Sequence, residues 1–235
     1  MPRKYILLAM IALGALLQVS PARAQAWQLD ASRLQAGPVP ARPIPFLTPN
    51  QADFKGDGAL ETLSLTGGRA RLLIGQEVAW QSPPEWQVSQ ALISDLVHSG
   101  RPQAVLLVWR PMRPWPVDQW LPHGGRIQSF HDPSGQSCQL ILIGWRRDAF
   151  TEIWAGSALA DPILAIAAAD LDGSGQDKLV TLEGAYADPR NAPAHDLKVW
   201  EWNGFGFSAV DSIQRTITAM ALVKDENGRI WILGP

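Results

Sequence analysis

Cysteine and histidine are scarce in this sequence, with one and four copies among 235 residues. The lone cysteine, Cys138, cannot form an internal disulfide, so packing alone must hold the chain together. The histidines show no spacing typical of a zinc site, and we expect them in surface loops. They are His98, His123, His131 and His195.

Long apolar runs are missing after residue 24, because no later stretch reaches the roughly 20 apolar residues that a transmembrane helix needs. Residues 1–24 predict a secretory signal peptide, in which two basic residues precede a short apolar stretch and Ala22-Arg23-Ala24 offers small residues for cleavage. Cleavage after Ala26 is one alternative, and an uncleaved N-terminal membrane anchor is another. The sequence therefore predicts an exported protein, periplasmic, extracellular or on the cell surface.

Positive charge is in deficit as well. Removing the three basic residues of the signal peptide from the 20 in the chain leaves 17, against 22 acidic side chains, so the mature net charge is about −5. This balance argues against nucleic acid or an anionic membrane surface as a partner.

Proline, glycine and tryptophan are plentiful, with 19, 20 and 11 copies. This composition favours many turns and wide, half-buried strands, and no stretch longer than about ten residues keeps a helical period after the signal peptide. Some 210 mature residues are enough for one domain. Residues 25–235 are therefore predicted to form a single all-β domain.

A strand-turn-strand pattern occurs four times along the chain. Each copy has a glycine at the same offset, and a β-rich run follows it. Anchored on Asp53, Asp95, Asp170 and Val223, the copies are 42, 75 and 53 residues apart, and the shortest step is the length of one four-stranded propeller blade. The four copies are "ADFKGDGALETLSL", "SDLVHSGRPQAVLLV", "AADLDGSGQDKLVTL" and "LVKDENGRIWIL".

The segments between these turns supply two further strands for each repeat. The clearest pair, "LKVWEW" and "FGFSAV", flanks Asn203-Gly204, a strong hairpin signal. Blades are predicted near residues 43–84, 87–158, 162–214 and 215–235. The last has only two strands, and an uncovered sheet edge is unfavourable. We expect residues 27–47 to pair with it and close the ring, with an open or partly closed form as the alternative.

The motif Asp170-Leu171-Asp172-Gly173-Ser174-Gly175 resembles the turn between the first two strands of a blade in the FG-GAP or VCBS repeat family of exported β-propellers. The turn from Asp53 to Gly58 is a fair match, and the other two copies are degenerate. The resemblance covers most of residues 43–235. It implies a small β-propeller of about four blades, and it implies no particular activity because propellers host unrelated functions.

The turn of this family holds calcium through side-chain oxygens at places one, three, five and nine, because a hard cation takes six to eight oxygen ligands. Asp170, Asp172 and Ser174 fit the first three places, but Lys178 stands at place nine. In the copy at Asp53, a lysine at place three would put a cation where calcium belongs. Calcium could therefore bind at one degenerate loop. The alternative is that these residues remain as turn formers, and no other cofactor is expected.

The stretch "SFHDPSGQSC" gathers Ser129, His131, Asp132, Ser134 and Cys138 within ten residues, which suggests a hydrolase. Members of a catalytic triad normally lie far apart in sequence, however, and these residue types are typical of a loop. The cysteine alternates with leucines, as a buried small apolar residue does. We therefore expect no catalytic residues here.

Nine tryptophans divide into two groups. Trp115 and Trp120 lie in "RPMRPWPVDQW", a proline-stiffened insertion that also contains Arg113. Preorganised aromatic side chains of this kind are typical of ligand-binding surfaces, so these three residues are the ligand-binding candidates; the alternative is that the insertion caps one face of the ring. The other seven fall in strand-like runs and are expected in the core: Trp80, Trp109, Trp145, Trp154, Trp200, Trp202 and Trp231.

These features favour a non-catalytic binding module with a protein, peptide or glycan ligand at the cell envelope or outside the cell. A hydrolase or lyase that uses a propeller face, near His131, is the first alternative. A structural component of a cell-envelope complex is the second.

Overall fold

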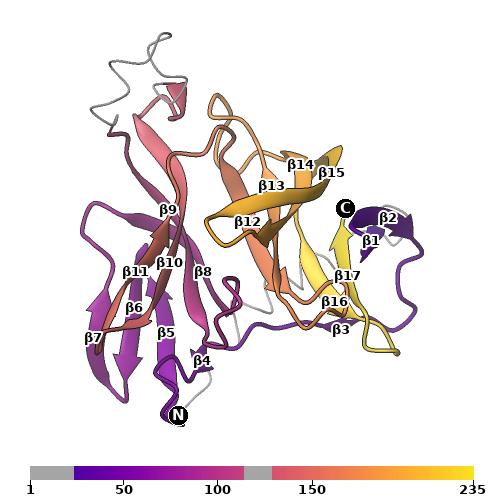
Figure 1. Ribbon diagram of the computed structural model, residues 1–235. Coiled ribbons are helices and arrows are strands. Elements are labelled where there is room, and N and C mark those ends of the chain that lie inside the picture. The colour runs from indigo at the N-terminus through magenta and orange to yellow at the C-terminus, as the bar shows by residue number, and fades with distance from the viewer. Residues whose placement is uncertain (1–23, 114–128) are drawn as a thin grey trace.

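The strands of this protein form four antiparallel sheets, arranged as a small four-bladed β-propeller (Figure 1). The structure is a computed structural model, and it describes residues 24–113 and 129–235. No helix long and apolar enough to cross a membrane occurs in these two ranges. The predicted all-β propeller fold is confirmed.

Three sheets are built from consecutive strands. The first blade contains β4 (Gln51–Ala52), β5 (Glu61–Thr66), β6 (Arg69–Ile74) and β7 (Glu77–Gln81). The second contains β8 (Gln87–Ser94), β9 (Gln103–Pro111), β10 (Gln136–Arg146) and β11 (Ala149–Ala155). The third contains β12 (Ile163–Ala169), β13 (Lys178–Glu183), β14 (Ala194–Trp202) and β15 (Phe207–Ile217). The hairpin predicted at Asn203-Gly204 joins β14 to β15.

The fourth sheet combines both ends of the described chain. It contains β16 (Ala221–Lys224) and β17 (Ile230–Gly234) together with β1 (Gln25–Asp30), β2 (Arg33–Gly37) and β3 (Ile44–Pro45). Ala26 pairs with Leu233, and Pro45 pairs with Val223. In Figure 1, the indigo β1 and β2 accordingly lie beside the yellow β17. The expected pairing of the N-terminal segment with the last two strands is therefore present.

Apolar side chains on the sheet faces pack one blade against the next. One cluster, which includes Phe54 and Phe150, joins the first blade to the second. Another, which includes Leu142 and Leu179, joins the second to the third, and a third, which includes Trp27, joins the third to the fourth sheet. No cluster among residues 24–113 and 129–235 joins the fourth sheet to the first. Closure of the ring at this point stays a prediction.

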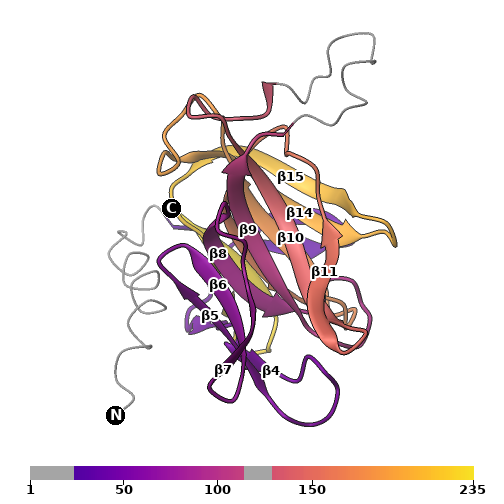
Figure 2. The same ribbon diagram turned by 90° about the vertical axis from the view of Figure 1, so that its left-hand side faces the viewer.

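Polar contacts supplement the apolar packing between the second and third blades. In Figure 2, β9 and β10 of the second blade lie in front of β14 and β15 of the third. Gln90 Nε2 donates to the carbonyl oxygen of Leu164 at 2.9 Å, and Gln90 Oε1 accepts from the amide of Ile166 at 2.9 Å. The side-chain amide of Gln90 thus makes the two backbone hydrogen bonds to β12 that a neighbouring strand would make. These bonds hold β8 and β12 in one relative position.

The seven tryptophans that were expected in the core are not all buried. Trp109 is buried, whereas the other six are half-buried. Trp27 and Trp86, which the strand pattern did not single out, are buried. Trp109 therefore lies in the core as expected, and five of the other rings pack against core clusters while they stay partly exposed to solvent: Trp80, Trp145, Trp154, Trp200 and Trp231.

We predict that Trp27→Ala lowers the free energy of unfolding by about 3–5 kcal/mol, because it removes a large buried aromatic side chain from the cluster between the third and fourth sheets. Chemical denaturation measures the loss. Leu47→Ala is the control, since Leu47 is 65% exposed and its truncation should change stability by less than about 0.5 kcal/mol. If the two substitutions changed the free energy of unfolding equally, β1 would not be an integral part of the fold.

Candidate functional site

Each blade contains one turn of the repeated type, which joins β4 to β5, β8 to β9, β12 to β13 and β16 to β17. We call these four the inner turns. In the first three, the leading aspartate accepts hydrogen bonds from backbone amides four and five residues later, as Asp170 does from Ser174 (3.0 Å) and Gly175 (2.8 Å). The glycine at the sixth place has φ between 78° and 86° in all four turns, a region that other residues rarely adopt. Aspartate and glycine are therefore needed for the turn itself.

The calcium candidates Asp170, Asp172 and Ser174 do lie together in the third turn. Lys178 Nζ lies among them, 2.7 Å from Asp172 Oδ2 and 3.4 Å from Ser174 Oγ. Partial burial raises the pKa of Asp172, but hydrogen bonds from Lys178 and Ser174 outweigh this and bring the pKa to about 2. The donor set therefore includes an ammonium group, which does not fit a divalent cation.

The first turn also places an ammonium group among its carboxylates, although the lysine stands at another position of the turn. Lys55 Nζ lies 2.8 Å from Asp57 Oδ2 and 3.2 Å from Glu61 Oε1. Within the two ranges that the structure describes, no three His, Cys, Asp or Glu side chains are grouped so that they could hold a metal ion.

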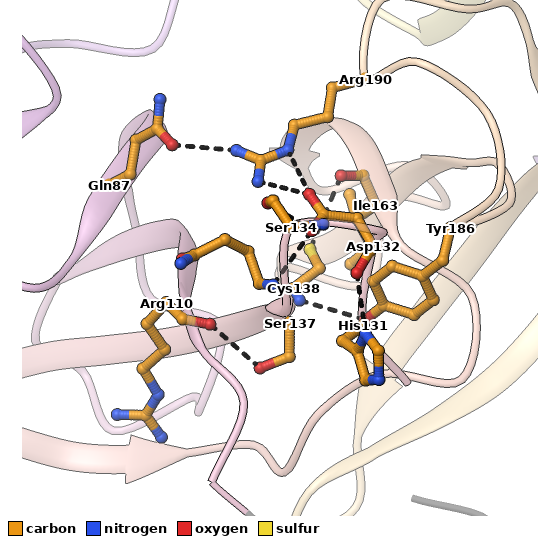
Figure 3. Close-up of polar contacts among 11 residues, drawn as sticks. Gln87, Arg110, His131, Asp132, Ser134, Ser137, Cys138, Ile163, Tyr186 and Arg190 are labelled. Atoms are coloured by element: carbon orange, nitrogen blue, oxygen red, sulfur yellow. Dashed lines mark hydrogen bonds and ion pairs between the residues drawn. The ribbon is translucent and has the colours of Figure 1, made fainter. Parts of the chain in front are cut away.

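An ion pair joins the loop at His131 and Asp132 to Arg190 of the third blade (Figure 3). Arg190 Nη2 lies 2.6 Å from Asp132 Oδ2, and its guanidinium group lies 3.8 Å from the ring centroid of Trp109. Burial raises the pKa of Asp132, but hydrogen bonds from Ser134, Arg190 and Gln136 outweigh it, so the pKa is about 2. This carboxylate stabilises the interface between two blades.

Cys138 lies beneath this loop and is fully buried. Its amide donates to Tyr186 Oη (3.1 Å), which donates in turn to the carbonyl oxygen of Leu159 (2.9 Å). Burial raises the pKa of the thiol to about 12. The predicted role as a small buried residue is consistent with this position.

Two of the residues that suggested a hydrolase have partners other than His131: Ser134 Oγ donates to Asp132 Oδ1 at 2.6 Å, and Cys138 Sγ lies 3.7 Å from the carbonyl oxygen of Ile163. His131 Nδ1 lies 2.7 Å from the backbone oxygen of Asp132, and the Asp132 carboxylate contacts Ser134 and Arg190. His123 lies outside the described residues. Among the other histidines, His98 bridges to the backbone oxygen of Asp177 at 3.0 Å, and His195 contacts Asp188 at the surface.

The ligand-binding candidates Trp115 and Trp120 also lie outside the described residues. Arg113, at the edge of that insertion, is exposed. The assignment of this insertion as a binding surface stays a prediction.

A cleft of about 420 Å³, which we call the aromatic cleft, lies between the second and third blades. Trp154, Trp200 and Phe207 form its apolar wall, and Glu183 and Lys198 form a polar patch beside it. Further lining residues come from β10, β12, β13 and the β11–β12 loop: Leu140, Gly156, Ser157, Leu159, Ala160, Asp161, Ile163 and Leu179. An apolar wall with a few convergent polar groups is typical of small-ligand sites.

The polar patch of the aromatic cleft is a connected network. Trp200 Nε1 donates to Thr181 Oγ1 (2.9 Å), which donates to Glu183 Oε1 (2.7 Å), and Lys198 Nζ lies 2.7 Å from Glu183 Oε2. Partial burial lowers the pKa of Lys198, but the hydrogen bond with Glu183 raises it above its usual value, so the lysine stays charged. The pairs Thr181–Lys198 and Leu179–Trp200 stand opposite each other on β13 and β14. Sequence spacing does not reveal such cross-strand neighbours.

Two other clefts have different linings. One of about 430 Å³ is lined by residues of β5, β8, β12 and β16 near the propeller axis and is mostly apolar. The other, of about 770 Å³, lies between the third blade and the fourth sheet and is lined by both signs of charge, including Asp30, Asp172, Lys224 and Arg229. Neither is lined by His131 or Asp132.

Comparison with known proteins adds little to this geometry. No family model matches the chain, and no curated protein matches it in sequence. Among solved structures, the chain matches BBS1N in the crystal structure of its complex with ARL6DN, soaked with mercury. The identity is 13%, the TM-score is 0.25, and the match covers 87% of this chain and 69% of that chain. A likeness this distant says nothing of what the present chain binds.

We predict that Asp132→Asn flattens the acid end of the stability profile. The pKa of Asp132 is about 2 in the folded protein and 3.8 ordinarily, so its ionised form stabilises the fold fully above about pH 4. That contribution is lost as the pH falls from about 4 to 2. Thermal unfolding of both proteins across this range checks the difference. Parallel profiles would contradict the Asp132–Arg190 contact.

We also predict that the thiol of Cys138 resists modification in the folded protein, because the thiolate is the reactive form and burial keeps the thiol protonated. Titration with a thiol reagent at pH 8 should find almost no reactive group in native buffer. About one per chain should react in denaturant. Rapid reaction of the native protein would show that this cysteine is accessible.

Proposed function

We propose that this protein is an exported, non-catalytic binding module of the FG-GAP/VCBS type and that the aromatic cleft holds its ligand. The observation that carries the proposal is the preorganised wall of Trp154, Trp200 and Phe207 beside a satisfied Lys198–Glu183 pair. Trp154 packs edge-on to Phe207 at 5.2 Å between centroids, and its indole nitrogen donates to the Phe205 carbonyl at 2.9 Å. Rings that are already fixed cost little entropy to use in binding.

The chemistry of the cleft favours a carbohydrate ring. A lysine ammonium has three donors and a carboxylate has about four acceptor positions, so the Lys198–Glu183 pair can still donate and accept after its own contacts are made. Hydroxyl groups match such a patch because each both donates and accepts. The aromatic wall suits the apolar face of the same ring. Asp161 Oδ2 also lies 3.8 Å from Lys198 Nζ, so acidic groups outnumber basic ones in the lining and an anionic ligand fits less well.

Within the export proposal, the first residues of β1 favour one of the two cleavage sites. Gln25 begins β1, and Ala26 is fully buried and paired with Leu233. Cleavage after Ala24 would leave β1 whole, whereas cleavage after Ala26 would remove two of its residues. We therefore favour Ala24 as the cleavage site. Intact mass of the exported protein would distinguish the two cleavage sites.

A non-catalytic role is supported by the contacts of the groups that could have acted as acid, base or nucleophile. Asp132 is paired with Arg190, and Cys138 is buried with a raised pKa. These groups serve packing between blades. A hydrolase or lyase activity of the mature protein on a carbohydrate substrate would contradict this part of the proposal.

The proposal is tested by measuring how much ligand is retained by a variant in which a bulky side chain fills the aromatic cleft. A glycan-array screen with the mature protein identifies the ligand, and Ala160→Trp then places a large side chain in the cleft without removing a buried one. We expect retention to fall at least about tenfold with little change in Tm, equivalent to about 1.4 kcal/mol of binding free energy. Ala41→Trp, at an exposed position outside the cleft, is the matched control and should bind normally.

Two further variants locate the ligand independently. If Trp115→Ala or Trp120→Ala abolishes retention while Ala160→Trp does not, the insertion is the binding surface and the cleft assignment is wrong. Retention of proteins rather than glycans in a pull-down would favour a peptide ligand or a structural role in an envelope complex.

A further inference from the structure

The four inner turns can be superimposed on their shared glycine, and this numbering reveals a common arrangement of donors. Place six is the glycine with positive φ in every turn. Place nine is then the first residue of the following strand in three turns and the second residue in the fourth. The residues at place nine are Glu61, Gln103, Lys178 and Trp231.

In the third turn, the donor at place nine is a lysine. Lys178 Nζ contacts Asp172 at place three and Ser174 at place five, at 2.7 Å and 3.4 Å. Only 7% of the lysine side chain is exposed. The ammonium group is thus enclosed by the oxygens of the turn.

In the second turn, an amide takes the same position. Gln103 Nε2 contacts Asp95 Oδ1 at place one (2.9 Å) and Ser99 Oγ at place five (3.2 Å), and it also donates to the carbonyl oxygen of Arg101. Gln103 is 1% exposed. A neutral N–H donor is therefore sufficient to fill this turn.

In the fourth turn, the donor at place nine is an indole. Trp231 Nε1 donates to Asp225 Oδ2 at place three, at 3.1 Å. The other oxygen of this carboxylate accepts from the amides of Asn227 and Arg229, each at 2.9 Å.

The first turn exchanges the two roles. Place nine is an acid, Glu61, and place three is the donor, Lys55, whose Nζ contacts Glu61 and Asp57. The acid and the base have changed places, yet a side-chain nitrogen still lies among the turn oxygens.

We infer that in all four blades a side-chain N–H of this chain takes the place that a calcium ion would occupy, so that the turns are complete without a divalent cation. The donors differ chemically, and they come from two different places in the turn, yet each contacts one or more of its side-chain oxygens. Calcium cannot share those oxygens with an ammonium group about 3 Å away, because like charges at this distance repel strongly. The inference is independent of the ligand in the aromatic cleft.

The experiment compares the mature protein with three variants at residue 178, each with calcium and with chelator. The unmodified protein should keep its Tm within about 1 °C in both conditions. Lys178→Gln should behave in the same way, because Gln103 already fills the second turn as an amide. Lys178→Ala should lower the Tm by about 2–6 °C, since Asp172 and Ser174 lose their partner.

The decisive variant is Lys178→Asp, which supplies an oxygen at place nine beside Asp170, Asp172 and Ser174. We expect calcium to raise its Tm by more than about 3 °C and terbium luminescence to appear, sensitised by nearby tryptophans. A calcium-dependent Tm in the unmodified protein would overturn the inference. So would unchanged stability of Lys178→Ala. If Lys178→Asp does not fold, these two results still decide the question.

Discussion

Each blade of this propeller depends on reversing the chain within a few residues at its inner turn. A reversal this tight leaves several backbone amides pointing inward, and buried or half-buried amides need partners. In the first three blades the leading aspartate accepts hydrogen bonds from two or three of these amides, as Asp53 does from Gly56, Asp57 and Gly58. In the fourth, Asp225 accepts from Asn227 and Arg229 instead. A side-chain nitrogen also contacts a carboxylate of each turn: Lys55 with Asp57, Gln103 with Asp95, Lys178 with Asp172 and Trp231 with Asp225. On the inference drawn above, these contacts complete the turns without a calcium ion.

The interface between the second and third blades is more polar than the other interfaces between blades. Gln90 bonds to the backbone of β12, Ser94 Oγ donates to Asp177 Oδ2 at 2.6 Å, and Arg190 joins Asp132 to the face of Trp109. Polar contacts fix one geometry, whereas apolar packing tolerates several. The aromatic cleft lies along this same interface, so its walls are held by groups on both sides. A defined cleft is what ligand recognition requires.

The architecture could be predicted because its signals are local. The glycine of each inner turn, the Asn203-Gly204 hairpin and the alternation of strands act over a few residues. The contact between Asp132 and Arg190 could not be predicted in this way, since it joins positions 58 residues apart and depends on how two blades meet. The same holds for Lys198 and Glu183, which lie on neighbouring strands.

Lys178 illustrates an intermediate case. Its place in the sequence already argued against calcium, but only the structure shows its ammonium group among the oxygens of the turn. For the tryptophans, the sequence alone does not predict burial. The sequence places both Trp109 and Trp154 in strand-like runs, but it does not show that the first is buried and the second half-buried. That difference is set by the shape of the gap between blades, which depends on the whole ring.

The pairing of β1 with β17 also affects when the fourth sheet can form during synthesis. Ala26 and Leu233 are neighbours in one sheet, although about 200 residues separate them along the chain. A ribosome adding roughly 5–20 residues per second needs about 10–40 s to make the stretch between them. Throughout that interval, the edge that β1 offers to β17 has no partner, so the fourth sheet is assembled last. The nascent chain therefore remains incompletely folded until its final strand has been made.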